Sequence, residues 1–295
     1  MDGSVAYHIA AGLGDVLEPF VFVAVLAAAS LHASWNAMVK VGLDRFSSIV
    51  LLALSGLGIS LVLLPFFPLP APAAWPFVIA SALIHVCYKL SLVKAYEHGD
   101  LSQVYPLARG AAPLVVAIVS AVFLGEVTTL TKVLAILSIG LGVCLMSVKG
   151  GAMGRMPPKA LGFALITAAC TASYTLVDGM GARLSESASG FIIMLTIVDG
   201  LFTTTYAFAT RGKTVFARLA PAWRSGVAAG AMSLASYWIA VWAFTQAPIA
   251  LVAALRETSV LFAMLIAVLF LKERAGVARI AAASLIAGGV VLMRI

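Results

Sequence analysis

The sequence contains uncharged runs far longer than the roughly 20 residues with which one helix crosses a bilayer. No Asp, Glu, Lys or Arg lies between Arg45 and Lys89, and a second uncharged run extends from Ser225 to Leu255. Across the chain, 62% of the residues are hydrophobic and 11% are charged, whereas soluble domains have about 25% charged residues. A soluble fold of 295 residues cannot bury that much apolar surface. We therefore expect an integral membrane protein in contact with lipid.

The excess of basic residues does not indicate a nucleic-acid partner. The formal net charge is +7, but the Lys and Arg residues stand singly or in small groups where apolar runs end. That distribution is typical of membrane proteins, in which Lys and Arg set the orientation of the chain. We expect no nucleic-acid partner.

The cysteines and the N-terminal segment predict neither a disulfide framework nor a cleaved leader. Cys87, Cys144 and Cys170 each stand alone inside an apolar run, which is typical of small core residues. Residues 1–19 contain no Lys or Arg but several acids, the opposite of a secretory leader. We interpret them as an N-terminal extension.

Ten apolar stretches have the length of a membrane-spanning helix. The run after Arg45 breaks at the proline-rich residues 65–72, and the run after Ser225 breaks at residues 246–248. Each of these runs therefore accounts for two helices. The predicted spans are residues 20–40, 46–66, 76–97, 101–124, 129–148, 160–182, 189–210, 225–246, 249–271 and 276–294.

The two halves of the chain repeat each other. Similar residues recur 147 positions apart in four pairs: Arg109 with Arg256, Glu126 with Glu273, Lys132 with Arg279, and Gly142 with Gly289. Because each repeat has five spans, the second half enters the membrane in the opposite sense, as in many transporters. The predicted fold is all-α, with ten transmembrane helices in two inverted five-helix repeats, residues 20–148 and 160–295, joined by a linker at 149–159.

The charges of the loops support this inverted relation. The loops after spans 7 and 9 carry clusters of basic residues, whereas the equivalent loops after spans 2 and 4 carry only Lys132. Cytoplasmic loops are enriched in Lys and Arg. Since most basic residues fall in the odd-numbered loops, we predict that these loops are cytoplasmic and that both termini face outward.

Two motifs recur at the same place in both halves. Spans 4 and 9 each contain an arginine, and they end in Leu124-Gly125-Glu126 and Leu271-Lys272-Glu273. In its ten-span, two-repeat layout and in these motifs, the chain resembles the drug/metabolite transporter superfamily, specifically its two-EamA-domain permeases, over residues 20–294. The resemblance implies a secondary transporter of the inner (plasma) membrane, often an exporter of amino acids, metabolites or drugs. It also implies a substrate cavity between the halves.

Arg109 and Arg256 are the candidate ligands for an anionic substrate group. At 1.5 Å per residue they lie about 12 Å and 10 Å along their spans, where an ionisable group is costly. A guanidinium can hold a carboxylate or a phosphate through two hydrogen bonds. The alternative is an ion pair with a neighbouring helix, or a side chain that extends toward the membrane surface.

Polar residues at i, i+3 and i+4 mark helix faces that we expect to line the cavity. The alternative is that Ser and Thr bond their own backbone and that each His is a packed core residue. The candidates are His32, Trp35 and Asn36 in span 1, His85, Tyr88 and Lys89 in span 3, Thr171, Tyr174, Thr175 and Asp178 in span 6, and Ser233, Ser236 and Tyr237 in span 8.

Asp199 and Asp178 are candidates for proton coupling. Asp199 lies near the middle of span 7, where burial favours the neutral carboxyl and allows proton uptake and release. Asp178 is the next candidate. The alternative for Asp199 is a buried ion pair with Arg256, Arg109 or Lys89.

Residues near the span ends have both structural and functional interpretations. Glu126 and Glu273 are expected to anchor the membrane interface or to form gate contacts. Trp238 and Trp242, one turn apart, would stack on a substrate or pack against other helices.

Other function classes receive little support. The sequence has no zinc-protease motif, nucleophile elbow, nucleotide-binding loop or metal-ligand spacing, so we expect neither an enzyme nor a cofactor or metal. No filter or charge ring indicates a channel. A membrane scaffold remains an alternative to a transporter of a small-molecule substrate.

Overall fold

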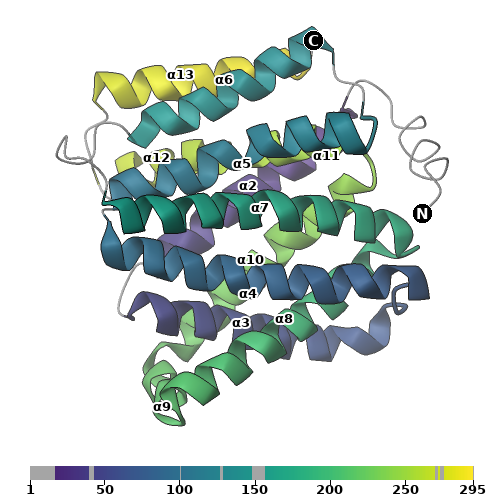
Figure 1. Ribbon diagram of the computed structural model, residues 1–295, viewed down its shortest axis with the longest axis vertical. Helices are drawn as coiled ribbons and strands as arrows, with labels where there is room; N and C mark the ends of the chain where they lie inside the picture. The colour runs from purple at the N-terminus through teal and green to yellow at the C-terminus, as the bar shows by residue number, and fades with distance from the viewer. Residues whose placement is uncertain are drawn as a thin grey trace.

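The protein is a bundle of helices (Figure 1). The computed structural model describes residues 17–39, 43–99, 101–126, 129–147, 157–269, 272 and 276–294. Within these residues every regular element is a helix. Nearly all of the predicted N-terminal extension, most of the predicted linker, and Glu273 lie outside the described residues.

Helices occupy all ten predicted spans. The long apolar runs form them because a helix satisfies its own backbone hydrogen bonds where no water is present. The helices are α2 (Pro19–Val39), α3 (Arg45–Leu63), α4 (Trp75–His98), α5 (Leu101–Phe123), α6 (Leu130–Ser147), α7 (Pro158–Leu184), α8 (Ala188–Arg211), α10 (Trp223–Phe244), α11 (Ile249–Arg256) with α12 (Ser259–Leu269), and α13 (Val277–Leu292).

Seven segments of the described chain are long and apolar enough to cross a membrane. They are Pro19–Met38, Arg45–Phe66, Pro72–His98, Pro158–Leu184, Ala188–Arg211, Thr214–Phe244 and Ile249–Leu269. Three shorter apolar helices, Leu107–Phe123, Leu130–Met146 and Val277–Leu292, lie in the remaining predicted spans. The chain is therefore a multi-pass membrane protein.

Two local features differ from the sequence prediction. The predicted span 249–271 is divided into α11 and α12. Short helices also occur in the connections: η1 (Leu64–Phe66), η2 (Pro72–Ala74), α9 (Thr214–Leu219) and η3 (Ala220–Ala222). Prolines at the first positions of η1, η2 and η3 favour these turns, because the fixed φ of proline suits the start of a helix.

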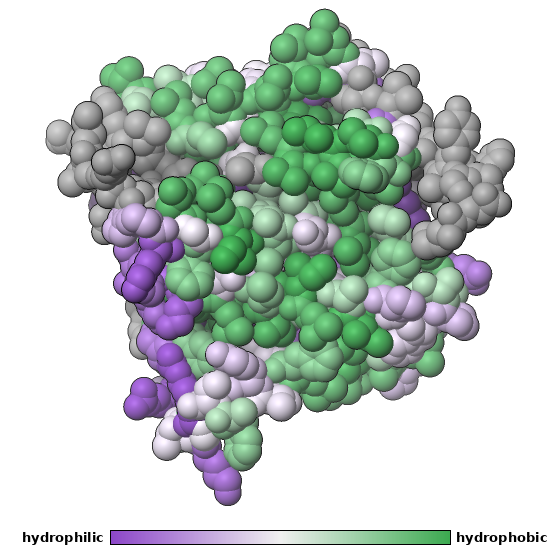
Figure 2. Space-filling model, viewed as in Figure 1, coloured by the Kyte–Doolittle hydropathy of each residue, from purple (hydrophilic) through white to green (hydrophobic). Residues whose placement is uncertain are grey.

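The surface has the polarity expected in lipid. Apolar residues cover most of the face in Figure 2, and hydrophilic residues gather along one edge near α9. Large side chains such as Phe123, Leu130 and Val277 are 76%, 74% and 82% exposed. A soluble protein does not leave so many such side chains in water.

The two halves of the chain pack mainly on each other. α4 packs on α7, and the equivalent pair in the exchanged repeats, α10 and α2, packs in the same way. α3 packs on α8, and α6 packs on α13 along one edge of the bundle (Figure 1). The core thus lies between the repeats.

The repeat-related Gly142 and Gly289 allow α6 and α13 to approach closely. A Cβ atom at Gly289 would lie 2.7 Å from Ile139 Cγ1 and 2.8 Å from the carbonyl oxygen of Ala135. A Cβ atom at Gly142 would meet Ile286 at 2.6 Å. Small residues at such contacts let helix backbones pack tightly in lipid.

The bundle has two ends, which we call the N/C end and the α9 end. At the N/C end Arg294 donates a hydrogen bond to the backbone of Leu17 (2.8 Å), and the Ala71 N–H donates one to the Ser185 carbonyl (3.0 Å). The α9 end contains the loops before α3 and after α8.

An acidic helix cap stabilises the α9 end. Asp44 accepts hydrogen bonds from the backbone N–H of Ser47 (3.2 Å) and from Arg211 (3.2 Å). Burial alone would raise the pKa of the Asp44 carboxyl, but the hydrogen bonds from Ser47 and Arg211 outweigh burial and lower it.

Candidate functional site

The interruption between α11 and α12 lies in the middle of the predicted ninth span. Here the N–H groups of Glu257 and Thr258 bond to the carbonyls of Ala254 (3.0 Å) and Leu255 (3.1 Å), three residues back. The Thr258 hydroxyl also donates to the Leu255 carbonyl (2.7 Å). These bonds satisfy some of the backbone groups left unpaired where the helix is interrupted. Arg256 and Glu257 lie at this turn. Broken helices at membrane depth commonly form transporter binding sites.

Arg109 and Glu257 form a buried ion pair between the repeats. Arg109 Nη2 of α5 donates to Glu257 Oε1 at 3.0 Å, and the two side chains are 10% and 7% exposed. Arg109 also acts electrostatically on Tyr88. The inter-helix pair weighed as an alternative for Arg109 is thus present, with an acid that the sequence analysis did not assign to the site.

Aromatic rings from three helices surround this ion pair. His85 of α4 stacks on Tyr174 of α7, with ring centroids 4.1 Å apart. Tyr88 and Tyr237 meet Tyr174 edge to face at 5.6 and 6.2 Å. His85, Tyr88, Tyr174 and Tyr237, each from one of the predicted faces of spans 3, 6 and 8, therefore come together. Such edge-to-face contacts also give a rigid wall to a site.

Arg256 lies over one of these rings. Its Cζ atom is 4.9 Å from the Tyr237 ring centroid, a cation–π contact. Among the described residues no carboxylate lies within ion-pair distance of Arg256. The Tyr237 hydroxyl donates to Asp178 Oδ2, and Asp178 is completely buried. A cation–π contact and a hydrogen bond therefore link Arg256 to Asp178 through Tyr237.

We use the name central cluster for the residues just described. They come from α4, α5, α7, α10 and the end of α11, and thus from both repeats. The central cluster consists of His85, Tyr88, Arg109, Tyr174, Asp178, Tyr237, Arg256 and Glu257.

Several buried polar atoms in and near the central cluster have no hydrogen-bond partner among the residues that the structure describes. They include Oδ1 of Asp178, Oε2 of Glu257 and Nε1 of Trp35. The Trp35 ring contacts His32 at 5.1 Å, and both cluster arginines act electrostatically on His32. An unpaired buried acceptor and donor are costly, so these atoms are available to a polar ligand.

Asp199 pairs with Lys89 away from the central cluster. Lys89 Nζ donates to the two carboxylate oxygens at 2.7 and 2.5 Å and to the Thr203 hydroxyl at 3.0 Å. Both charged side chains are largely buried, at 17% and 15% exposure. The ion pair weighed as the alternative for Asp199 is therefore present, and it connects α4 with α8.

Three other candidates lie outside the central cluster. Asn36 is exposed and donates to the His32 carbonyl of its own helix (2.8 Å). Trp238 donates to the Ser189 hydroxyl (3.0 Å) and packs on Phe67. Trp242 packs on Phe20 near the N/C end. These contacts match the structural interpretation of each residue.

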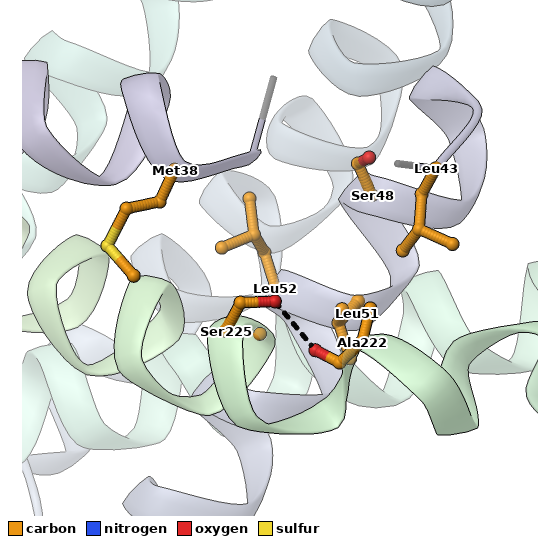
Figure 3. A pocket seen from close by; sticks show the side chains of 8 residues that line it. Met38, Leu43, Ser48, Leu51, Leu52, Ala222 and Ser225 are labelled. Carbon is orange, nitrogen blue, oxygen red and sulfur yellow. Dashed lines mark hydrogen bonds between the residues drawn. The ribbon is translucent and has the colours of Figure 1, made fainter. Parts of the chain in front are cut away.

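The pocket in Figure 3 lies between α2, α3 and α10 at the α9 end, away from the central cluster. Its cavity volume is about 20 Å³, enough for about one water molecule. Inside it the Ser225 hydroxyl donates to the Ala222 carbonyl (3.0 Å). The lining residues are Met38, Leu43, Ser48, Leu51, Leu52, Ala222, Ser225 and Gly226.

Comparison with known proteins identifies the family. The model of the EamA-like transporter family matches residues 19–148 and again residues 158–295. The chain belongs to the EamA-like transporter family. This finding confirms the resemblance deduced from the repeated motifs.

A solved crystal structure has the same fold as this EamA-like protein. It is described only as the crystal structure of a protein, and it matches with a TM-score of 0.70 at 18% sequence identity. The match covers 92% of this chain and 96% of the other. No curated protein matches the sequence.

The structure corrects the interpretation of the cysteines as core residues: Cys87 is exposed, whereas Cys144 and Cys170 are partly buried, and all three are free thiols. The Sγ atoms of Cys87 on α4 and Cys170 on α7 lie 3.5 Å apart. Separation in sequence hid this contact between the repeats.

Sequence reasoning also missed Arg183 at the end of α7. Arg183 Nη2 donates to Glu126 Oε1 at 2.8 Å, and both side chains are buried. The position of Arg183 near a predicted span end gave no signal of this partner.

Proposed function

We propose that this EamA-like protein is a secondary transporter, an exporter of a small metabolite, that works by alternating access between two inverted five-helix repeats. Its ten spans cross the inner membrane with both termini outward. The main support is that the central cluster takes residues from both repeats and contains a broken helix. A charged substrate group can leave water and enter the central cluster only if side chains there supply opposite charges or hydrogen bonds.

Arg256 is the proposed contact for an anionic substrate group. Arg109 is already paired with Glu257 at 3.0 Å, whereas Arg256 has only its cation–π contact with Tyr237 among the described contacts. The Trp35 N–H would add a second donor. The free Glu257 Oε2 is an acceptor for an ammonium or hydroxyl group. These atoms favour an amino-acid-like zwitterion or an organic anion as substrate.

The aromatic side chains give the proposed site its apolar part. His32, Tyr88, Tyr174 and Tyr237 would contact the body of the substrate. His85 stacks directly on Tyr174 and holds this ring in place. Asn36 and Trp238, which lie elsewhere, are expected to affect transport less.

Asp178 is the better proposed site for proton coupling. Asp199 already has the Lys89 ammonium as an ion-pair partner at 2.5 Å. Asp178 is completely buried, and its described partner is a neutral hydroxyl. Because Asp178 has no ion-pair partner among the described residues, its carboxyl can exchange a proton when the site opens.

Counterflow in proteoliposomes tests the substrate proposal. Vesicles loaded with single amino acids, organic acids or cations would identify a solute that exchanges. Arg256→Ala should nearly abolish its binding, and Arg256→Lys should weaken it because Lys cannot form two parallel hydrogen bonds. Arg224→Ala, at an exposed arginine near Trp223, is the matched control. Unchanged affinity in both Arg256 variants would make this arginine structural.

The proton proposal needs separate measurements of exchange and accumulation. Asp178→Asn should retain solute exchange and lose accumulation driven by a pH gradient. Asp199→Asn should instead lower stability, because it leaves the largely buried Lys89 ammonium without its carboxylate. Accumulation by Asp178→Asn, with the pH gradient as the only energy source, would contradict the assignment.

A further inference from the structure

A second group of buried charges lies at the N/C end, outside the central cluster. Glu126 follows α5 of the first repeat, and Arg183 is in the last turn of α7 of the second repeat. Their side chains are 2% and 8% exposed, and Arg183 Nη2 lies 2.8 Å from Glu126 Oε1. A buried ion pair is costly to desolvate unless its other hydrogen bonds are satisfied.

Further hydrogen bonds of this pair go to one connection, the turn between α10 and α11. Both oxygens of Glu126 accept from the Ile249 N–H at 3.1 Å. Arg183 donates from Nε to the Phe244 carbonyl (2.8 Å) and from Nη2 to the Ala247 carbonyl (3.1 Å). The pair thus fastens the start of α11 to both α5 and α7.

α11 is therefore held at both of its ends by residues of the first repeat. Glu126 binds its first N–H, and Arg109 binds Glu257 just after its last residue. The helix has only eight residues and is separated from α12 by the turn at Glu257. A short helix held at two ends by ion pairs can be released from either end without unfolding its neighbours.

Other contacts close the same end of the bundle. The proline-rich connection between η1 and η2 contacts the start of α8 so closely that a Cβ atom at Gly190 would lie 2.1 Å from the Pro68 carbonyl oxygen. Phe67 packs on Trp238 beside it, with ring centroids 5.0 Å apart. These contacts pack the helix ends and connections closely together at the N/C end.

We propose that Glu126 and Arg183 form the latch of a gate at the N/C end, which holds α11 against α5 and closes the path to the central cluster. This inference rests on the transport function proposed above. The latch opens when the carboxylate releases the Ile249 N–H and the guanidinium releases the two carbonyls. Glu126 and Arg183 are positioning residues, since neither belongs to the central cluster.

The test measures access to a buried position beneath the latch. Ser120 is 1% exposed, and its carbonyl accepts the Glu126 N–H (3.2 Å). Its hydroxyl has no partner among the described residues, so Ser120→Cys is nearly isosteric. In a background with the three native cysteines replaced by serine, the new thiol is reacted with a membrane-impermeant maleimide in detergent micelles.

Glu126→Gln should raise the labelling rate of Ser120→Cys about tenfold or more, because the charge-assisted hydrogen bonds are lost. Arg183→Lys keeps the charge but cannot make all three bonds, so it should give an intermediate rate. Arg183→Lys also serves as the second variant if Glu126→Gln does not fold. Glu97→Gln, which removes the exposed partner of Lys94, should leave the rate unchanged.

A general loss of stability is separated from gate opening by one more control. Gly289→Ala should loosen the α6–α13 contact, which makes none of the hydrogen bonds of the latch, and lower the melting temperature without speeding labelling. A rate in Glu126→Gln and Arg183→Lys equal to that of the parent would overturn the proposal. Because labelling needs no substrate, this result is independent of the counterflow experiments on the proposed transport function.

Discussion

The Arg109–Glu257 pair offers a direct measurement of how strongly the central cluster stabilises the fold. We predict that Glu257→Gln lowers the free energy of unfolding by about 3–5 kcal/mol, the cost of leaving one member of a buried pair without its partner. The side chains are 10% and 7% exposed, so little solvent reaches the guanidinium. The Lys94–Glu97 pair, at 53% and 47% exposure, should contribute only about 0–1 kcal/mol.

The assay is a double-mutant cycle of Arg109→Gln and Glu257→Gln. Unfolding free energies would come from denaturant titrations in mixed micelles, with the midpoint and slope fitted together. The double variant should be less destabilised than the sum of the two single variants by about 2 kcal/mol, because neither charge is then left alone. The same cycle on Lys94 and Glu97 is the control.

Two results would refute this reasoning. A loss of less than about 1 kcal/mol in Glu257→Gln would mean that water or another group stabilises the buried guanidinium equally well. Strict additivity would mean that the two side chains do not act on each other, despite the 3.0 Å distance. In either case Arg109 would again become a candidate for direct contact with substrate.

Three further predictions follow from other parts of the bundle. Gly289→Ala should destabilise the protein by about 1–3 kcal/mol by overpacking, whereas Gly288→Ala, with nothing within 4 Å of the added Cβ, should not; melting curves of both variants decide this. Because the pKa of Asp44 is lowered in the folded state, ionised Asp44 stabilises the fold at pH values above its ordinary pKa of 3.8, and this contribution is lost as the pH falls. The stability of Asp44→Asn should therefore approach that of the parent in acid. An oxidant such as copper phenanthroline should join Cys87 to Cys170 with a mass loss of about 2 Da, because two thiol protons leave with two electrons, and Cys170→Ser should abolish the product.

The helices were largely predictable because the solvent around them is lipid. In lipid, an uninterrupted apolar run has almost no alternative to a helix, so charges and prolines mark its ends. α5, for example, covers Leu101–Phe123 against the predicted 101–124. The interruption of the ninth span at Glu257 was not predictable from hydropathy. Its cause is a local exchange of backbone hydrogen bonds together with an ion pair to a residue far away in the sequence.

The polar helix faces of the candidate site were predictable from the sequence, but the ion-pair partners of its charged residues were not. The spacing of polar residues predicted that His85, Tyr174 and Tyr237 each lie on a polar face of their own helix, because residues one turn apart share a face. Whether Asp199 pairs with Lys89, and Arg109 with Glu257, depends on how each helix is rotated about its axis and shifted along it. Those quantities are set by close packing of side chains, which a single sequence does not reveal.

The Arg109–Glu257 pair also has a consequence for the conformation in which the protein rests. Glu257 stands in the second half where the first half has Gly110, so the chain contains this charge only once. In a transporter built from two identical inverted halves, the states open to either side of the membrane would have equal free energy. A single unmatched carboxylate removes that degeneracy. The protein should therefore rest mostly in one of its two states, even with the same solution on both sides.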